Sequence, residues 1–143
     1  MSKVKPYPEP SFDALPDQVN EAAVLYYMNT SPVNVESIDR LREISGFNDA
    51  NVAEWLNINV KTLRSYKSGR TSIKEHVQEK VVILLSLFKH GKKLFGTYEK
   101  FSAWLGSANF FFDKKPPETF LKTYSGTKYL DGRLTAMEYG DNV

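Results

Sequence analysis

The stretch that decides the fold is NDANVAEWLNINVKTLRSYKSGR, residues 48–70, in which two short amphipathic segments flank a tight turn. A helix-turn-helix needs a small residue where its helices cross and a turn residue that tolerates positive φ. Ala53 occupies the crossing position, and Asn57 occupies the turn position, where asparagine is the next most tolerant choice after glycine. Asn59 is a suitable N-cap for the second helix. The stretch therefore predicts a helix-turn-helix.

The second helix has an apolar face and a basic, polar face. Ile58, Leu63 and Tyr66 fall on buried positions. The opposite face carries polar residues at i, i+3, i+4 and i+7, namely Lys61, Arg64, Ser65 and Ser68. The 20 residues from Trp55 to Lys74 contain no acidic residue and five basic ones, a local charge of +5. This charge favours a phosphate-rich partner.

The spacing predicts DNA binding by this helix, because the start of such a helix reaches base edges in the major groove. Arg64 can read guanine with two hydrogen bonds, and Thr62 or Ser65 can read either partner of a base pair. The other basic residues are suited to phosphates. The predicted DNA-binding set is Lys61, Thr62, Arg64, Ser65, Lys67, Arg70 and Lys74. The alternative is a helical hairpin whose basic face is only solvated.

The sequence around this motif predicts further helices and no confident strand, so the expected fold is all-α. On the N-terminal side, apolar residues at helical spacing follow Pro16, and a second helix fits residues 35–45, with Gly46 as its stop. Residues 1–16 contain four prolines and predict an extended or disordered arm. After the motif, Gly69 ends the second helix of the pair, and a long buried helix is expected over 73–95, loosened or ended at Gly91.

The C-terminal part predicts three shorter segments. Thr97 can cap a helix that closes at Gly106, and Pro117 can begin another that Gly126 stops. The last helix is expected over 127–139. The predicted organisation is an arm (1–16), a helical DNA-binding domain (17–92) and a small helical domain for partner binding or dimerisation (93–143).

The composition indicates a folded protein that needs no disulfides. The chain has 143 residues, 41% of them hydrophobic, a net charge of +2 and no cysteine. The longest apolar run, 81–88, is far shorter than the roughly 20 residues that span a bilayer. The first ten residues lack the apolar core of a signal peptide. We therefore expect a cytoplasmic protein without membrane contacts.

The C-terminal half, residues 94–140, carries an ordered series of motif residues. They are Phe95, Phe101, Trp104-Leu105, Asn109, Pro117, Phe120-Leu121, Thr123, Gly126, Leu134 and Glu138-Tyr139-Gly140. The series resembles the toxin-binding domain of the Xre/MbcA/ParS antitoxin family. The preceding helix-turn-helix is similar to the Xre/Cro-like DNA-binding half of the same proteins, so the resemblance covers roughly residues 20–140.

The resemblance implies an antitoxin of a type II toxin–antitoxin pair. Its partner would be a RES-domain toxin that consumes NAD, blocked largely by the C-terminal end of the antitoxin. The resemblance also implies repression of its own operon and a homodimer. At the C-terminal end, the expected toxin-binding residues are Glu138, Tyr139, Gly140, Asp141, Asn142 and Val143. Phe111 and Phe112 are added on a separate ground: three consecutive rings cannot all point inward from a loop, so one or two are expected in the core and at least one at the dimer or toxin interface. The loop Phe110–Lys115 departs from the family's small, glycine-containing loop, so family contacts there do not carry over.

No residue set in the sequence indicates catalysis or a cofactor. His76 and His90 lie fourteen residues apart on one predicted helix, about 20 Å along its axis, so they cannot share a metal ion. Asp131 and Glu138 are expected to be ordinary surface acids. Phe95, Phe101, Trp104 and Phe120 are expected to be core aromatics. A domain of about 45 residues is marginal alone, which is an independent reason to expect a dimer or a partner.

Two other interpretations fit the same residues. The chain could be a stand-alone dimeric helix-turn-helix repressor whose C-terminal half only dimerises. It could also be a helical protein-interaction adaptor that does not bind DNA. A salt-dependent DNA complex would separate both regulators from the adaptor.

Overall fold

The computed structural model describes residues 12–109 and 112–140, and all regular elements in these residues are helical. The α-helices are α1 (Glu21–Thr30), α2 (Val35–Ser45), α3 (Asp49–Trp55), α4 (Val60–Lys67), α5 (Glu75–Phe95), α6 (Tyr98–Leu105) and α7 (Tyr124–Glu138). Two short 3-10 helices, η1 (Phe12–Ala14) and η3 (Pro117–Lys122), complete them. The all-α prediction is thus confirmed for the described part of the chain.

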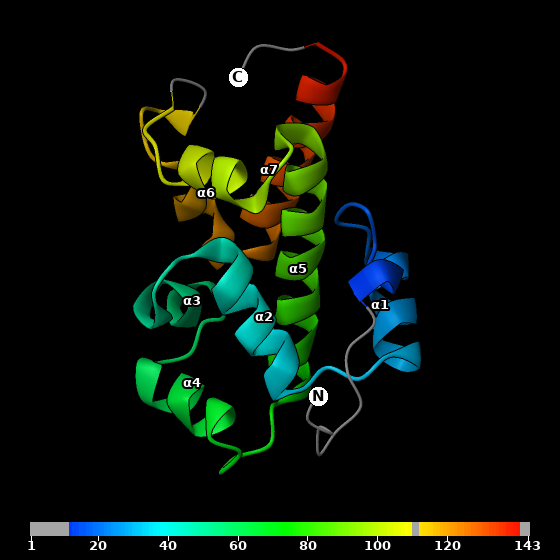
Figure 1. Cartoon of the computed structure of the whole chain (residues 1–143), viewed down its shortest axis with the longest axis vertical. Coiled ribbons are helices and arrows are strands. Elements are labelled where there is room, and N and C mark those ends of the chain that lie inside the picture. Colours follow the sequence, from blue (N-terminus) through cyan, green and yellow to red (C-terminus); the bar gives the residue numbers. More distant parts are fainter. Residues whose placement is uncertain (1–11, 110–111, 141–143) are drawn as a thin grey trace, which may run out of the picture.

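The longest helix, α5, is the axis of the molecule (Figure 1). α1 packs on one side of α5 and α2 on another, and α3 and α4 extend from the α2 side toward the lower end of the view. α6 packs on the second half of α5, toward the upper end of the view, and α7 runs along α5 from Lys80 to His90. The two ends of α5 therefore lie near different parts of the chain.

Side-chain caps and glycines set the helix ends largely where the sequence predicts them. Asn59 accepts from the backbone N–H of Thr62 at 2.7 Å and begins α4, and Thr97 begins α6 in the same way. Gly46 ends α2 with φ +68°, a left-handed conformation that glycine adopts without strain. The bounds of α2 are the predicted ones.

Two glycines predicted to stop helices lie inside them. Gly91 sits within α5, where a Cβ would come within 2.4 Å of the Phe101 ring. Gly126 sits in the first turn of α7, where a Cβ would come within 2.2 Å of the Phe120 carbonyl oxygen. Both glycines serve close approach of another segment, and α7 consequently begins at Tyr124 rather than near 127. The segment from Pro117 forms a 3-10 helix instead of an α-helix.

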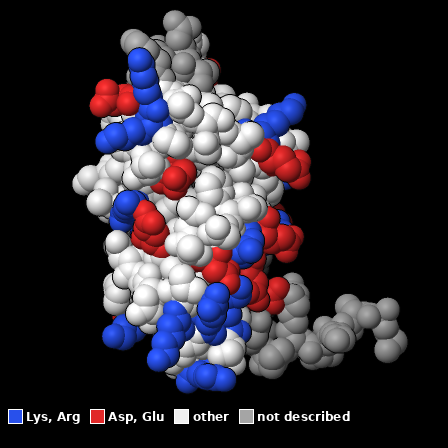
Figure 2. Space-filling view, turned by 90° about the vertical axis from the view of Figure 1, so that its left-hand side faces the viewer, with Lys and Arg blue, Asp and Glu red and all other residues white. Residues whose placement is uncertain are grey.

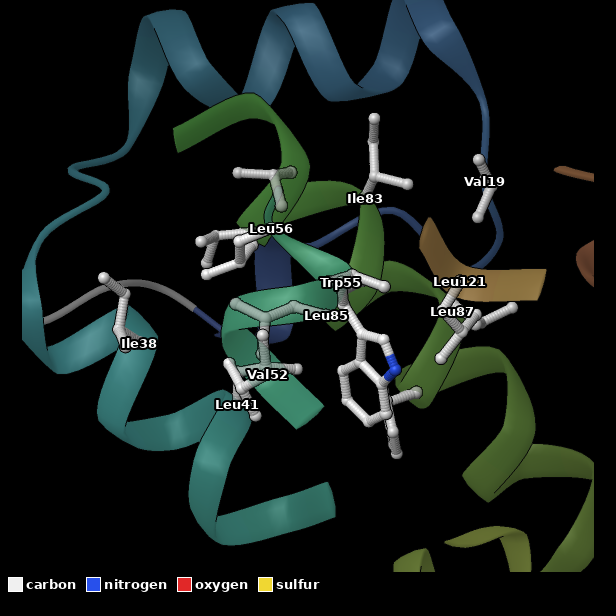
Figure 3. Close-up of a cluster of buried hydrophobic side chains, with 14 of the residues drawn as sticks. Val19, Ile38, Leu41, Val52, Trp55, Leu56, Ile83, Leu85, Leu87 and Leu121 are labelled. Atoms are coloured by element: carbon white, nitrogen blue, oxygen red, sulfur yellow. The ribbon is translucent and has the colours of Figure 1, made fainter. Parts of the chain in front are cut away.

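The core gathers around α5 from both halves of the chain (Figure 3). Leu85 and Leu87 of α5 are buried together with Leu41 of α2, Trp55 of α3 and Leu121 of η3. α5 continues without interruption across the expected boundary at 92/93. The division into two domains therefore stays a prediction, since one buried cluster includes residues from both sides of it.

Part of the expected N-terminal arm is packed. Leu15 is buried, and the Lys89 ammonium of α5 donates to the carbonyl oxygens of Asp13 and Leu15 at 3.1 and 2.8 Å. Residues 1–11 lie outside the described residues. The expectation of an extended arm is therefore wrong for residues 12–16, which the α5 lysine and the core hold in place.

Candidate nucleic-acid interface

The two helices of the predicted motif, α3 and α4, meet at a turn of the expected kind. Asn57 has φ +58°, the left-handed conformation predicted for the turn position. The Ile58 N–H donates to the Ala53 carbonyl at 3.0 Å, and Ala53 is buried where α3 is crossed. Leu63 and Tyr66 hold the inner face of α4 in the core. These contacts fix the orientation of α4 and leave its polar face outside.

The turn is also held by η3, which the sequence analysis did not foresee. The Asn57 side-chain amide donates to the Lys122 carbonyl at 2.9 Å, and the Trp55 indole N–H donates to the Glu118 carboxylate at 3.2 Å. Lys122 also pairs with Glu54 at 2.7 Å. We call these three interactions the α3–η3 contacts. They join the turn of the helix-turn-helix to a segment more than 60 residues later, a separation that no local sequence signal reveals.

Four of the predicted DNA-binding residues form an exposed basic surface. These are Lys61, Arg64, Arg70 and Lys74, from α4 and the loop that follows it. Figure 2 shows Lys and Arg side chains gathered at the lower end of the molecule, the end at which α4 lies in Figure 1. A hollow of about 610 Å³ beside α4 is lined by Lys61, Thr62, Ser65 and Lys74 among others. The basic surface is therefore grooved rather than flat.

Ser65 is tied to the loop after α4. Its hydroxyl lies 2.6 Å from that of Thr71, and its carbonyl accepts from the Arg70 N–H at 3.0 Å. Thr62, by contrast, is half-buried at the start of α4 and its backbone N–H meets the Asn59 cap. The structure thus gives Ser65 a role in fixing the loop that carries Arg70, which the sequence analysis missed.

Lys67 has a structural partner. Its ammonium lies 3.2 Å from the Asp49 carboxylate, which also accepts from Arg42 of α2 at 3.1 Å. Burial of the Asp49 carboxyl opposes its ionisation, but the hydrogen bonds and charges of Lys67 and Arg42 outweigh burial and lower the pKa of Asp49. Lys67 thereby joins α4 to α3 and is less available to phosphate than the four exposed cations.

The expected toxin-binding residues differ in their exposure, and several of them lie outside the described residues. Phe112 is only 2% exposed and packs edge-on against Trp104 and Phe120, so its predicted place at an interface is wrong: the loop turns its ring into the core. Tyr139 is 86% exposed at the end of α7, and Gly140 follows with φ +97°. Phe111, Asp141, Asn142 and Val143 lie outside the described residues.

Of the four predicted core aromatics, Phe101 is buried, and Phe95, Trp104 and Phe120 are partly buried and pack against the core. Phe101 is fully buried, and its ring lies 5.7 Å from that of Phe95 and 6.0 Å from that of Trp104. Phe120 extends this cluster through Phe112, at 5.1 Å between ring centroids. The cluster fills the space between α6, η3 and the second half of α5.

Glu138 takes part in a buried charge cluster. The His90 Nδ1 lies 2.8 Å from the Asp131 carboxylate, and its Nε2 is hydrogen-bonded to the Glu138 carboxylate. We call these three residues the His90 cluster. The expectation that Asp131 is a surface acid is wrong, because Asp131 is buried against His90. His76, in contrast, is exposed at the start of α5.

The cluster favours a charged histidine and not a metal site. Burial of the His90 ring opposes its positive charge, but the hydrogen bonds and charges of Asp131 and Glu138 outweigh burial and raise its pKa. The two carboxylates approach opposite ring nitrogens, so they cannot share one metal ion with one nitrogen. Among residues 12–109 and 112–140, no three His, Asp or Glu side chains are arranged so that they could hold a metal ion together.

A buried lysine lies at the other contact of α5 with α7. The Lys80 ammonium donates to the Thr127 hydroxyl at 3.2 Å, and burial lowers the pKa of Lys80 to about 8. Neither a sequence motif nor a charge pattern marks Lys80 as buried, since it is one of several lysines on α5.

Comparisons of this chain with models of protein families, with curated proteins and with solved structures give no match. Among the helices of the described residues, none has the length and apolar character required to cross a membrane.

Proposed function

We propose that this chain binds double-stranded DNA by placing α4 in the major groove. The observation that carries the proposal is the basic surface, four exposed cations on a helix and loop whose orientation is fixed by a helix-turn-helix turn. The inner side of α4 is occupied by the core, so the basic face is the one left for a partner. A chain of phosphates matches such a face in charge and in extent.

The residues divide by what they can reach. Arg64 points outward from the middle of α4 and is the residue suited to two hydrogen bonds with guanine, while Thr62 is suited to a neighbouring base. Lys61, Arg70 and Lys74 are suited to phosphates, which fix position but not sequence. Ser65 acts through Thr71 by holding the loop that carries Arg70.

The test is binding of labelled DNA from upstream of the chain's own coding region, measured by fluorescence anisotropy. Arg64→Ala should weaken binding by about 1–3 kcal/mol and relax the preference at one base position. Lys93→Ala is the matched control, since Lys93 is an exposed cation at the far end of α5 and should leave binding unchanged. Equal affinity of wild type and Arg64→Ala for every sequence would remove Arg64 from the DNA contacts, and absence of binding by the wild type would favour the adaptor interpretation.

We further propose that the chain is an antitoxin that neutralises a RES-domain toxin and represses its own operon as a homodimer. The residue series of the C-terminal half supports this proposal, and so does the exposed Tyr139 at the end of α7, which the core does not use. A large exposed aromatic side chain beside a helix end is a suitable anchor for a protein partner. A stand-alone repressor is the alternative.

Removal of residues 139–143 tests the antitoxin proposal. The truncated chain should keep its melting temperature and DNA affinity, because these residues follow the last helix. Growth of cells that co-express a RES-domain toxin should be rescued by the full chain and rescued poorly by the truncated one. Full rescue by the truncated chain would remove the end of α7 from the toxin surface, and no rescue by either chain would favour the stand-alone repressor.

A further inference from the structure

The imidazole of His90 is held on both edges, and each edge faces a carboxylate of α7. Nδ1 lies 2.8 Å from Asp131 Oδ1, and Nε2 is bonded to Glu138 Oε1. Carboxylate oxygens without protons only accept hydrogen bonds, so both ring nitrogens must donate. Only the doubly protonated imidazolium has two N–H donors. The observed arrangement therefore belongs to the charged ring.

Loss of one proton breaks this arrangement at one edge. The neutral ring keeps one N–H donor, and the other nitrogen then presents a lone pair to a carboxylate. The unprotonated nitrogen and the carboxylate oxygen are then both acceptors, so the hydrogen bond between them is lost and the carboxylate charge is left without a partner. One of the two carboxylates must then separate from the ring.

The exposures of the two carboxylates indicate which one separates. The Asp131 side chain is 8% exposed and that of Glu138 is 30% exposed. Glu138 is the last residue of α7, whereas Asp131 lies in its middle. Water can replace His90 as the partner of Glu138 at much lower cost than it can for Asp131. Glu138 is therefore the one released.

We propose that the charged ring of His90 fastens the last turn of α7 to α5, and that loss of one ring proton releases Glu138 and loosens the helix end at Tyr139 and Gly140. The hydrogen bonds that close this end are those from the Tyr139 and Gly140 N–H groups to the Ala136 and Met137 carbonyls. The proposal rests on the proposed antitoxin function in one respect, that Tyr139 belongs to the toxin surface. The fastening itself does not depend on any partner.

The direction of the pH effect follows from the surroundings of His90. Its pKa is raised above the ordinary value of 6.5, so the fastening is complete below about pH 6.5 and is lost as the pH rises through the raised value. Asp131 and Glu138 are the charged groups that act on the ring, and both come from α7. On the α6 side, the ring of Phe101 covers the neighbouring Gly91. On the α1 side, Lys89 is directed to Asp17.

Two other groups near the α5–α7 contact must be kept apart from His90. Burial raises the pKa of Tyr124 to about 12, with smaller contributions from Glu21 and Asp131 among others, so Tyr124 stays neutral throughout the relevant pH range. Lys80 has a pKa lowered to about 8 and has the opposite sign, because its loss of a proton favours the folded state. A loss of order that accompanies rising pH therefore cannot come from Lys80.

The experiment follows the ring and the helix end together by nuclear magnetic resonance from pH 5 to 9. The ring signals give the pKa of His90, with the exposed His76 as an internal reference. Amide hydrogen exchange of Tyr139 and Gly140, corrected for the intrinsic rate at each pH, gives the protection of the helix end. We expect protection to fall with the midpoint of the His90 titration. Constant protection across that titration would overturn the proposal.

Glu138→Gln is the variant that isolates the fastening, because the amide can accept from a charged ring and donate to a neutral one. The pKa of His90 should fall in this variant, and protection of the helix end should no longer depend on pH. Each unit by which the pKa of His90 falls in Glu138→Gln corresponds to about a tenfold factor in the equilibrium constant that couples ring protonation to closure of the helix end. A variant whose protection still follows the His90 midpoint would overturn the role of Glu138.

Measurements of toxin binding at different pH values test the fastening by His90 and the proposed antitoxin function separately. Affinity for a RES-domain toxin should be higher below the His90 midpoint than above it in the wild type, since a preformed end binds with less loss of entropy. In Glu138→Gln the affinity should lack this step. Absence of toxin binding at every pH would overturn the antitoxin proposal while leaving the exchange results to decide the fastening.

Discussion

The start of α5 follows a helix and loop whose cations are exposed, whereas its end holds a histidine buried between two carboxylates. At the basic surface, each charge is solvated and costs the fold little, so the cations are free to serve a partner. At the His90 cluster, the charges of His90 and Asp131 are buried and are tolerated because each has a partner, whereas Glu138 keeps part of its contact with water. The same helix thus separates exposed charge from charge used in packing.

The two regions should consequently respond to different solution conditions. Salt screens exposed charges within about 10 Å at 0.1 M, so the basic surface should be sensitive to ionic strength. A buried cluster is screened much less and should respond to proton concentration instead. Experiments in which only one variable changes can therefore address each end of α5 separately.

The largest expected effect comes from breaking the buried cluster. Asp131→Ala leaves His90 without its more buried partner and should lower the free energy of unfolding by about 3–5 kcal/mol. Urea denaturation at pH 6 measures this difference. Glu138→Gln is the control, expected to cost less than about 1 kcal/mol because the Glu138 side chain is partly solvated. Equal losses in both variants would contradict the division of roles within the cluster.

A smaller effect of opposite sign is expected at Lys80. Lys80→Met removes a buried charge that has a hydroxyl partner and no carboxylate in its hydrogen bond, and should stabilise the protein by about 1–2 kcal/mol at pH 7. The lysine of the wild type becomes neutral in the fold above about pH 8, so the advantage of methionine should shrink as the pH rises toward 10. Thermal unfolding of both proteins at pH 7 and pH 9.5 measures this advantage. An equal stability difference at the two pH values would contradict the destabilising charge of Lys80 at pH 7.

The basic surface should show its effect in the salt dependence of DNA binding. Arg70→Ala should weaken binding of all sequences by about 1 kcal/mol and reduce the slope of log K against log salt by about 1. Its stability should remain within about 0.5 kcal/mol of the wild type, since Arg70 is exposed. An unchanged slope would remove Arg70 from the phosphate contacts.

The smallest effect is expected at Lys67, whose partly exposed ion pair is intermediate between the exposed cations and the buried His90 cluster. Its pair with Asp49 is partly exposed, so Lys67→Met should change the free energy of unfolding by about 0.2–1 kcal/mol. DNA affinity should fall less than in Arg70→Ala, because Lys67 already has a partner. A larger loss of affinity than in Arg70→Ala would return Lys67 to the phosphate contacts.

Local patterns predicted the parts of the fold that depend on neighbouring residues. Asn57 predicted the turn and Asn59 predicted the N-cap of α4, because each residue acts within a few positions of its own place in the sequence. The apolar spacing of residues 35–45 predicted α2 for the same reason. Gly91 and Gly126 were misread because their role is set by Phe101 and by the Phe120 carbonyl, which the sequence does not place beside them.

The candidate sites also differ in whether they depend on residues near in sequence or on residues that folding brings together. The basic surface could be predicted, since an absence of acids over 20 residues is visible in the sequence. The His90 cluster could not, because His90 and Asp131 are 41 residues apart and become neighbours only when α7 packs on α5. One or two of the three consecutive rings were expected in the core, but the sequence does not show which, and Phe112, assigned to the interface, is the one that the structure shows to be buried.

The α3–η3 contacts have a consequence for protein engineering. A fragment that ends before Pro117 would keep every residue of the helix-turn-helix, yet the indole of Trp55 and the amide of Asn57 would lose their acceptors. It would also lose Leu121, which is fully buried. A chimaera that transplants α3 and α4 into another protein should therefore carry η3 with them, because the two helices are not a self-contained module.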